Sequence, residues 1–160
     1  MSVIDGLVEW NRSRREVPPA TGPHPSRRLA ILTCMDARID PARLFGVEPG
    51  DAHVIRNAGA VVTDDVVRSL LVSQSALGTR AVVVIAHTSC GMEGLDEAML
   101  VSELEAGTGW RADQSFGGFE DVRDHVGESV RRLRSHPGLR GEVRGFVLDI
   151  TTGALDEVHV

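Results

Sequence analysis

The chain has 160 residues, with 17 basic side chains, 23 acidic ones and a formal net charge of −6. Its length predicts a single domain over residues 1–160 with one hydrophobic core. No apolar run approaches the ~20 residues of a membrane span, and the N-terminus lacks the basic-then-apolar order of a secretory signal. We therefore expect a soluble, cytoplasmic protein with no membrane contact. No basic block is present either, which argues against nucleic acid as a partner.

The N-terminal residues predict a helix that does not pack into the core of its own subunit. Residues 3–15 form a short amphipathic pattern with Val3, Ile4 and Leu7 on one side. Two prolines end it, and a proline-rich linker over residues 18–25 follows. Because a helix on such a linker is poorly placed to fold back, we expect residues 1–17 to pack on a partner subunit.

The next segments alternate between strand and helix patterns. Residues 28–34, 52–55 and 81–86 predict strands, the first with the low polarity of a strand covered on both faces of a parallel sheet. Thr63 and two following acidic residues predict the start of a helix over 64–77, which makes a right-handed parallel strand–helix–strand unit. The remaining patterns predict helices over 39–45, 95–105 and 119–135, a glycine-rich loop over 107–118, and strands over 143–150 and 155–160. The fold class is therefore α/β.

Two of these apolar runs lead directly into potential metal ligands. Cys34 follows the first strand, and His87 and Cys90 follow the third. Functional groups of open α/β sheets collect at the carboxyl ends of the strands, so neighbouring strands would bring these three side chains to one point. Two thiolates and one imidazole form a ligand set known from catalytic zinc sites, in which the fourth position is left for water or substrate.

Other states of the two cysteines remain open. Two cysteines also permit a disulfide or two inert buried thiols, although a disulfide is least expected in a cytoplasmic chain. Taken singly, each cysteine fits a buried structural thiol better than a ligand. Their joint placement at matching strand ends favours a metal.

Asp36 and Arg38 follow Cys34 by two and four residues. A carboxylate beside a divalent cation either ligates it or accepts a proton from its bound water, and an arginine within reach can decide between the two by pairing with the carboxylate. We expect Arg38 to hold Asp36 off the metal. The sequence also permits Asp36 as the fourth ligand of a resting form.

The motifs Cys34-Met-Asp-Ala-Arg38 and His87-Thr-Ser-Cys-Gly91 resemble those of the β-class carbonic anhydrases. The similarity is close over residues 27–94, including the loop Arg56-Asn-Ala-Gly59. It implies a zinc enzyme that interconverts carbon dioxide and bicarbonate on a three-layer, mostly parallel four-stranded sheet with an added antiparallel C-terminal edge strand. It also implies a catalytic Asp–Arg dyad, a substrate pocket to which the amide of Gly91 contributes, and homodimers or larger homo-oligomers that exchange the N-terminal helix. The glycine loop over residues 56–60 is a candidate wall of the site, which adds Gly59 to the expected pocket.

The sequence departs from parts of the family. Pro25 stands where the plant-like branch has a glutamine that contacts substrate, which resembles the compact prokaryotic branch. Some bacterial members have a second, inhibitory bicarbonate site built from Trp, Arg and Tyr. Only Arg56 matches it, because Ile31 and Ser75 occupy the other two positions, and we predict no such site.

Two other functions remain open. The first is a related zinc hydrolase that acts on carbon disulfide or carbonyl sulfide, with residues 95–118 setting access to the pocket. The second is a noncatalytic zinc-binding or thiol-sensing module. The sequence does not single out a proton acceptor among the other histidines, which are His24, His53, His125, His136 and His159.

Overall fold

The computed structural model describes residues 2–15, 17–18 and 22–160, and Pro19, Ala20 and Thr21 of the expected linker lie outside them. One five-stranded sheet has the order β2-β1-β3-β4-β5. The first four strands pair in parallel and β5 pairs antiparallel to β4, which confirms the expected sheet. The strands are β1 (Leu29–Cys34), β2 (Ala52–Asn57), β3 (Ala81–His87), β4 (Glu142–Leu148) and β5 (Leu155–Val158).

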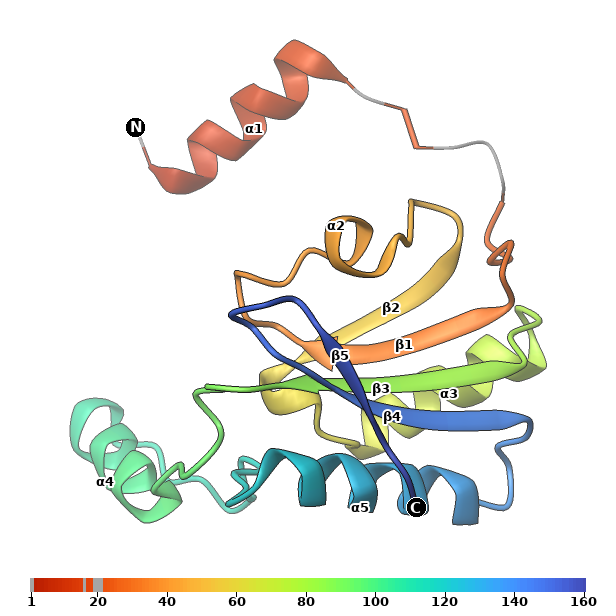
Figure 1. The fold of residues 1–160 in the computed structure, drawn as a ribbon. Helices are drawn as coiled ribbons and strands as arrows, with labels where there is room; N and C mark the ends of the chain where they lie inside the picture. The colour runs from red at the N-terminus through yellow and green to blue at the C-terminus, as the bar shows by residue number, and fades with distance from the viewer. Residues whose placement is uncertain (1, 16, 19–21) are drawn as a thin grey trace.

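The helices form layers on both sides of this sheet (Figure 1). Two of them, α3 and α5, cover one face, where their valines and leucines pack on alternate residues of β1, β3 and β4. The short α2 lies on the other face, over a smaller core that includes Ile31, Ile85 and Leu148. The helices are α1 (Val3–Arg14), α2 (Pro41–Phe45), α3 (Asp64–Ser75), α4 (Glu97–Thr108) and α5 (Val122–Ser135).

Several element boundaries differ from the sequence pattern because capping side chains decide them. The α4 helix spans 97–108 rather than 95–105, since the Asp96 carboxylate accepts the backbone N–H of Met99. The α5 helix begins at Val122 rather than at 119, because the carboxylate of Asp121 caps it. β2 continues beyond residue 55 to Asn57, which is paired with Cys34. Apolar spacing alone carries no information on these ends.

The α1 helix stands apart from the sheet (Figure 1). Ser2 and Asp5 form a capping box at its start, which supports the helix locally. No residue of α1 is buried, and its apolar side chains are open to solvent, with Val3 93%, Ile4 74% and Leu7 70% exposed. Among the described residues, no helix is both long and apolar enough to cross a membrane.

Gly145 allows α5 to lie close against the sheet. A Cβ atom at this position of β4 would come within 2.4 Å of Val126 Cγ1 and 2.7 Å of Val130 Cγ2. Both valines are fully buried, so neither can move aside without disturbing the core. A glycine is therefore needed where β4 crosses beneath α5.

We expect Gly145→Ala to lower the free energy of unfolding by about 1–3 kcal/mol, the usual cost of overpacking a core. Urea denaturation followed by circular dichroism would measure it. Gly6→Ala is the matched control, because a Cβ on this helical glycine meets no atom within 4 Å and alanine is the better helix former. Equal stability of the two variants would contradict the close packing at Gly145.

Candidate metal centre

The pairing of β1 with β3 brings the predicted ligands to one end of the sheet. The two strands run in parallel with Thr33 opposite Ile85, so that Cys34 and His87 both lie at their carboxyl ends. A turn over residues 88–90 follows β3, with Ser89 in the left-handed region at φ 54°. This turn directs Cys90 back toward the other two side chains.

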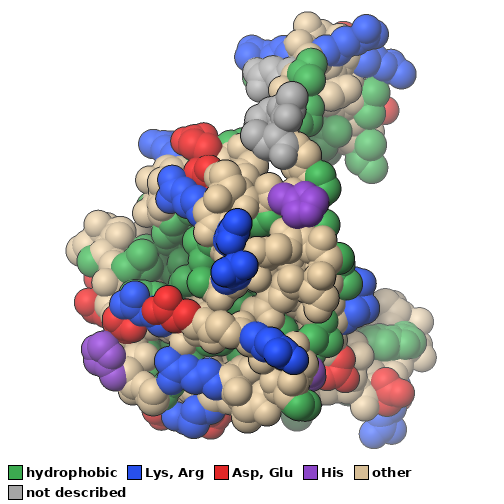
Figure 2. Space-filling model, turned by 90° about the vertical axis from the view of Figure 1, so that its right-hand side faces the viewer, with side chains coloured by type: hydrophobic (Ala, Val, Ile, Leu, Met, Phe, Trp, Pro, Cys, Tyr) green, Lys and Arg blue, Asp and Glu red, His purple; other side chains and the backbone are tan. Residues whose placement is uncertain are grey.

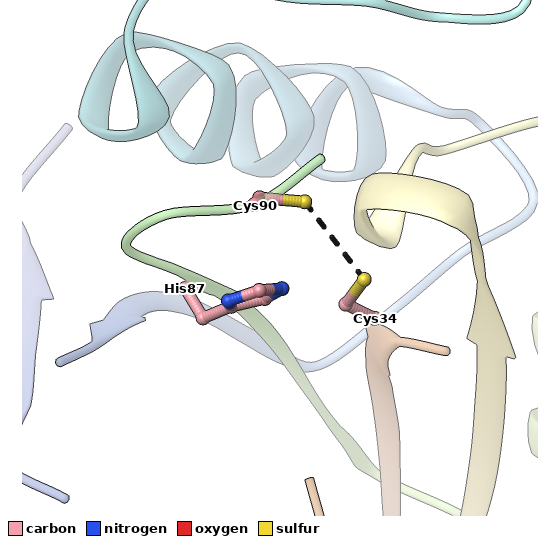
Figure 3. Close-up of side chains that lie close together, drawn as sticks. All are labelled: Cys34, His87 and Cys90. Carbon is pink, nitrogen blue, oxygen red and sulfur yellow. Dashed lines mark hydrogen bonds between the residues drawn. The ribbon is translucent and has the colours of Figure 1, made fainter. Parts of the chain in front are cut away.

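Cys34, His87 and Cys90 form one buried group of potential ligands (Figure 3). Their ligand atoms all lie within 4.8 Å of one another, and the two sulfur atoms are 3.9 Å apart. Both cysteines are free thiols, since a disulfide requires sulfur atoms ~2.05 Å apart. The structure thus brings together the three side chains that the sequence predicted as ligands.

The imidazole of His87 is oriented for a metal. Its Nδ1 lies 2.9 Å from the carbonyl oxygen of Thr88, which can only accept, so the proton resides on Nδ1 and the lone pair on Nε2. His87 is fully buried, and Nε2 has no hydrogen-bond partner among the described residues. Ligating histidines characteristically donate their second nitrogen to a carbonyl in this way.

The thiol of Cys90 needs a bound cation to become a thiolate. Burial raises its pKa to about 11, and the neighbouring Cys34 adds to this shift, so the thiol is protonated at neutral pH in the metal-free protein. A divalent metal removes this proton because it stabilises the thiolate. An unpaired imidazole nitrogen and two buried thiols therefore fit a thiolate-preferring metal ion.

Asp36 lies at the edge of this group and is held by Arg38. Arg38 Nε and Nη2 donate to the two carboxylate oxygens over 2.9 and 2.7 Å, and the Arg38 backbone N–H donates to Oδ1 over 2.9 Å. These hydrogen bonds hold the pKa of Asp36 well below its usual range. The Oδ2 atom is 3.7 Å from His87 Nε2, so the carboxylate is adjacent to the centre while it is paired with Arg38.

Arg56 fixes the backbone between the ligand and the acid. Its Nε donates to the carbonyl of Cys34 over 2.9 Å, and its Nη2 donates to the carbonyl of Asp36 over 2.7 Å. Sequence reasoning placed Arg56 in the wall of the site but did not foresee these two contacts. No sequence signal marks a side chain whose acceptors are main-chain carbonyls 20 and 22 residues away.

The two glycines predicted for the substrate pocket differ in their surroundings. Gly59 has φ 76°, and a Cβ there would come within 3.0 Å of Met92 Cγ and 3.2 Å of Phe119 Cε1. Asn57 closes the turn around it by bonding both the N–H and the carbonyl of Val61. A Cβ at Gly91 would meet no atom within 4 Å, so the space in front of its backbone is open.

One of the candidate proton acceptors lies near these glycines. His125 of α5 donates from Nε2 to the carbonyl of Gly59 over 2.9 Å and stacks on Phe119, with ring centroids 4.2 Å apart. Burial lowers its pKa. His125 therefore supports the Gly59 turn, a contact that the amphipathic pattern of α5 could not reveal. His53 is bonded elsewhere, to Ser73 and to the carbonyl of Pro23.

An α/β sheet with a buried Cys–His–Cys group and a neighbouring Asp–Arg pair defines a class of metalloprotein. Comparison with known proteins identifies the family. The carbonic anhydrase family matches residues 29–111. The chain is 45% identical over 136 residues to β-carbonic anhydrase 1 of Mycobacterium tuberculosis H37Rv, which covers 84% of this chain and 83% of the relative. The chain belongs to the β-carbonic anhydrase family.

Two further relatives bear on fold and activity. The crystal structure of a carbonic anhydrase from Streptococcus mutans superimposes with a TM-score of 0.89 at 36% identity, over 99% of both chains. A carbon disulfide hydrolase of Acidianus sp. A1-3 is 31% identical over 156 residues, which cover 81% of this chain and 76% of the relative. The family therefore includes relatives named for two different substrates.

We expect the affinity of the metal-free protein for Zn²⁺ to fall as pH is lowered from 8 to 6. Binding must displace the proton of the Cys90 thiol, whose pKa is raised, and each displaced proton weakens binding about tenfold per pH unit below that pKa. Competition with a chromophoric chelator would measure how steeply the affinity changes with pH. The Asp36→Asn variant should keep the same pH dependence, and a pH-independent affinity would mean that no thiol proton is released.

Proposed function

We propose that this protein catalyses the reversible hydration of carbon dioxide to bicarbonate and a proton, with zinc held by Cys34, His87 and Cys90. The observation that carries the proposal is the convergence of these three side chains on one buried point beside a carboxylate that Arg38 restrains. Membership of the β-carbonic anhydrase family supports the same reaction.

Zinc, when bound, supplies the Lewis acidity that makes water a nucleophile. In a three-histidine site the pKa of the bound water is about 7. Two thiolates offset more of the metal's charge, so the water should be less acidic here. The Asp36 carboxylate is ionised throughout the neutral range, since its pKa lies far below it. Its Oδ2 accepts a hydrogen bond from the attacking water and so aims the oxygen lone pair at carbon dioxide. Arg38 keeps this carboxylate from ligating the metal.

The other residues of the site have supporting roles in this proposal. Arg56 holds the main chain between Cys34 and Asp36 in place. Gly59 and Gly91 would line the substrate pocket, Gly59 as a tight backbone wall and Gly91 as an exposed residue with open space at its Cα. Because Asp36 is paired with Arg38 over three hydrogen bonds, the carboxylate would leave the remaining ligand position of a bound zinc to water or substrate.

We expect Asp36→Ala to lower the turnover for carbon dioxide hydration by about 100-fold or more while zinc stays bound, because the variant loses the acceptor that orients the attacking water. Stopped-flow hydration assays together with zinc analysis would measure both quantities. Asp65→Ala is the matched control, since Asp65 also pairs with an arginine but lies on the surface of α3. Undiminished turnover in Asp36→Ala would support a noncatalytic zinc module instead.

We expect the hydration rate of the wild-type enzyme to rise from pH 7 toward alkaline pH. The water deprotonates less readily than in a three-histidine site because two thiolates surround the metal. Asp36 adds no step in this range, since its carboxylate titrates only under strongly acidic conditions. Stopped-flow rates across pH 6.5 to 9 would test this, and a flat or acid-favoured profile would argue against the water as the titrating group.

Hydrolysis of carbon disulfide or carbonyl sulfide is the second candidate, because a carbon disulfide hydrolase is among the relatives. Both reactions would use the same nucleophile and acid–arginine pair. The difference would then lie in access to the pocket, which we propose residues 95–118 control. A competition assay with carbon dioxide and carbon disulfide on the same enzyme preparation would distinguish the two.

We also infer that the protein is a homodimer or a larger homo-oligomer in the cytoplasm, in which α1 packs on a neighbouring subunit. Support comes from the exposure of Val3, Ile4 and Leu7 on a helix that buries none of its residues in its own subunit and has a capping box at its start. Water-exposed apolar stripes of this kind mark contact surfaces. Residues 18–160 would then form one domain, with α1 as the exchanged arm.

We expect Leu7→Asp to shift the protein toward monomers, because a carboxylate would have to be buried without a partner in the subunit contact. Sedimentation velocity over a range of concentrations would measure the shift. Ser13→Asp adds the same charge to the same helix on the side opposite the apolar stripe and should leave the assembly unchanged. The helix has no such role if both variants sediment like the wild type.

A further inference from the structure

Three arginines lie together at the end of the sheet opposite the metal centre. Arg28 and Arg80 directly precede β1 and β3, and Arg140 stands two residues before β4. These three strands are neighbours in the sheet. Figure 2 views the molecule from this end and shows arginine side chains spread over the middle of the surface.

The three guanidinium groups have no counter-charge within the part of the chain that the structure describes. Among the described residues, none of them makes an ion pair or a side-chain hydrogen bond, whereas Arg27, Arg38 and Arg144 all pair with carboxylates. The three arginines are exposed and precede three successive strands of the sheet, so their positive charges add up on one surface. This is unexpected in a chain with a net charge of −6.

Two adjoining hollows lie between these arginines. The first, of about 550 Å³, is lined by Arg80 and Arg140, and the second, of about 360 Å³, is lined by Arg28 and Arg80. Gln74 and Thr79 border both. No Asp or Glu lines either hollow, so the positive potential is concentrated there. Their size suits a small molecule.

The backbone around the hollows is held firmly. Gln74 bonds both the N–H and the carbonyl of Arg140, over 3.0 and 2.8 Å. The N–H of Arg80 donates to the carbonyl of Arg28 over 2.8 Å. Gly141 must remain glycine, because a Cβ would lie 2.0 Å from the Arg80 carbonyl oxygen. The three arginine positions are therefore fixed relative to one another before any ligand arrives.

The floor of the hollows is polar and ordered. Thr79, only 4% exposed, lies 2.9 Å from the hydroxyl of Ser73, and that hydroxyl lies 2.7 Å from His53 Nδ1. Because His53 Nε2 must donate to the carbonyl of Pro23, Ser73 donates to Nδ1 and Thr79 donates to Ser73. Thr79 then keeps acceptor capacity on its hydroxyl oxygen, and the residue lines both hollows.

We propose that Arg28, Arg80 and Arg140 bind a small phosphate dianion, either free or as a monoester of a small polar molecule. The planar guanidinium fork matches phosphate oxygens in a bidentate manner, and several forks on fixed backbone positions favour a multiply charged anion over a singly charged one. Thr79 accepts a hydrogen bond from a protonated phosphate oxygen or from a ligand hydroxyl. This site is independent of the proposed catalytic function, because it lies at the other end of the strands.

Isothermal titration calorimetry of the full-length, zinc-loaded protein with inorganic phosphate and with glycerol 2-phosphate tests the proposal, with glycerol as the uncharged control. We expect saturable binding of at least one phosphate probe and none of glycerol. Arg80→Gln should weaken it by about tenfold or more, the loss of one charge-assisted pair. Arg43→Gln removes an exposed arginine of α2 that lines neither hollow and should leave binding unchanged.

The outcomes separate the two sources of the phosphate group. Tighter binding of glycerol 2-phosphate identifies a monoester as the ligand, and equal or tighter binding of inorganic phosphate identifies the free ion. Arg140→Gln serves as a second variant if Arg80→Gln fails to fold, which circular dichroism would reveal. The proposal is overturned if neither probe binds at millimolar concentration, or if the folded variants bind phosphate as tightly as the wild type.

Discussion

The parallel pairing of β1 with β3 is the interaction on which the candidate site depends. Its register places Cys34 and His87 at the same end of the sheet, although 53 positions of chain separate them. A slip of one residue would turn one of the two side chains to the other face. Successive strand residues are buried alternately against α3 and α5 on one face and against α2 on the other. This packing prevents such a slip, so the core also determines the geometry of the potential ligands.

Around this pairing, arginines determine what the centre can do. Arg38 keeps the Asp36 carboxylate ionised and turned toward a guanidinium, while Arg56 anchors the main chain on both sides of Met35. In the proposed mechanism, an acid restrained in this way accepts a hydrogen bond instead of becoming a ligand. The catalytic use of a bound metal would then depend on residues that do not touch it.

Much of this arrangement could be predicted from the sequence, for physical reasons. Local residue patterns located the five strands and the five α-helices of the described residues. The two motifs named the three potential ligands and the Asp–Arg pair, because each motif depends on local residue order. Helix ends at Asp96 and Asp121 were misplaced, since capping depends on individual side-chain contacts. The contacts of Arg56 and of His125 could not be predicted, because their partners are main-chain carbonyls brought close only by the complete fold.

The unpaired Nε2 of His87 has a consequence for the whole molecule. Among the described residues Nε2 has no partner, and a buried polar atom in that situation costs about 1–3 kcal/mol, a cost that a bound ion would remove. Because a ligand that binds only the native state stabilises it in proportion to the logarithm of its free concentration, metal supply and resistance to unfolding are linked. Newly made chains that have not yet acquired an ion are then the ones most open to proteolysis, which couples the abundance of the protein to the availability of its cofactor.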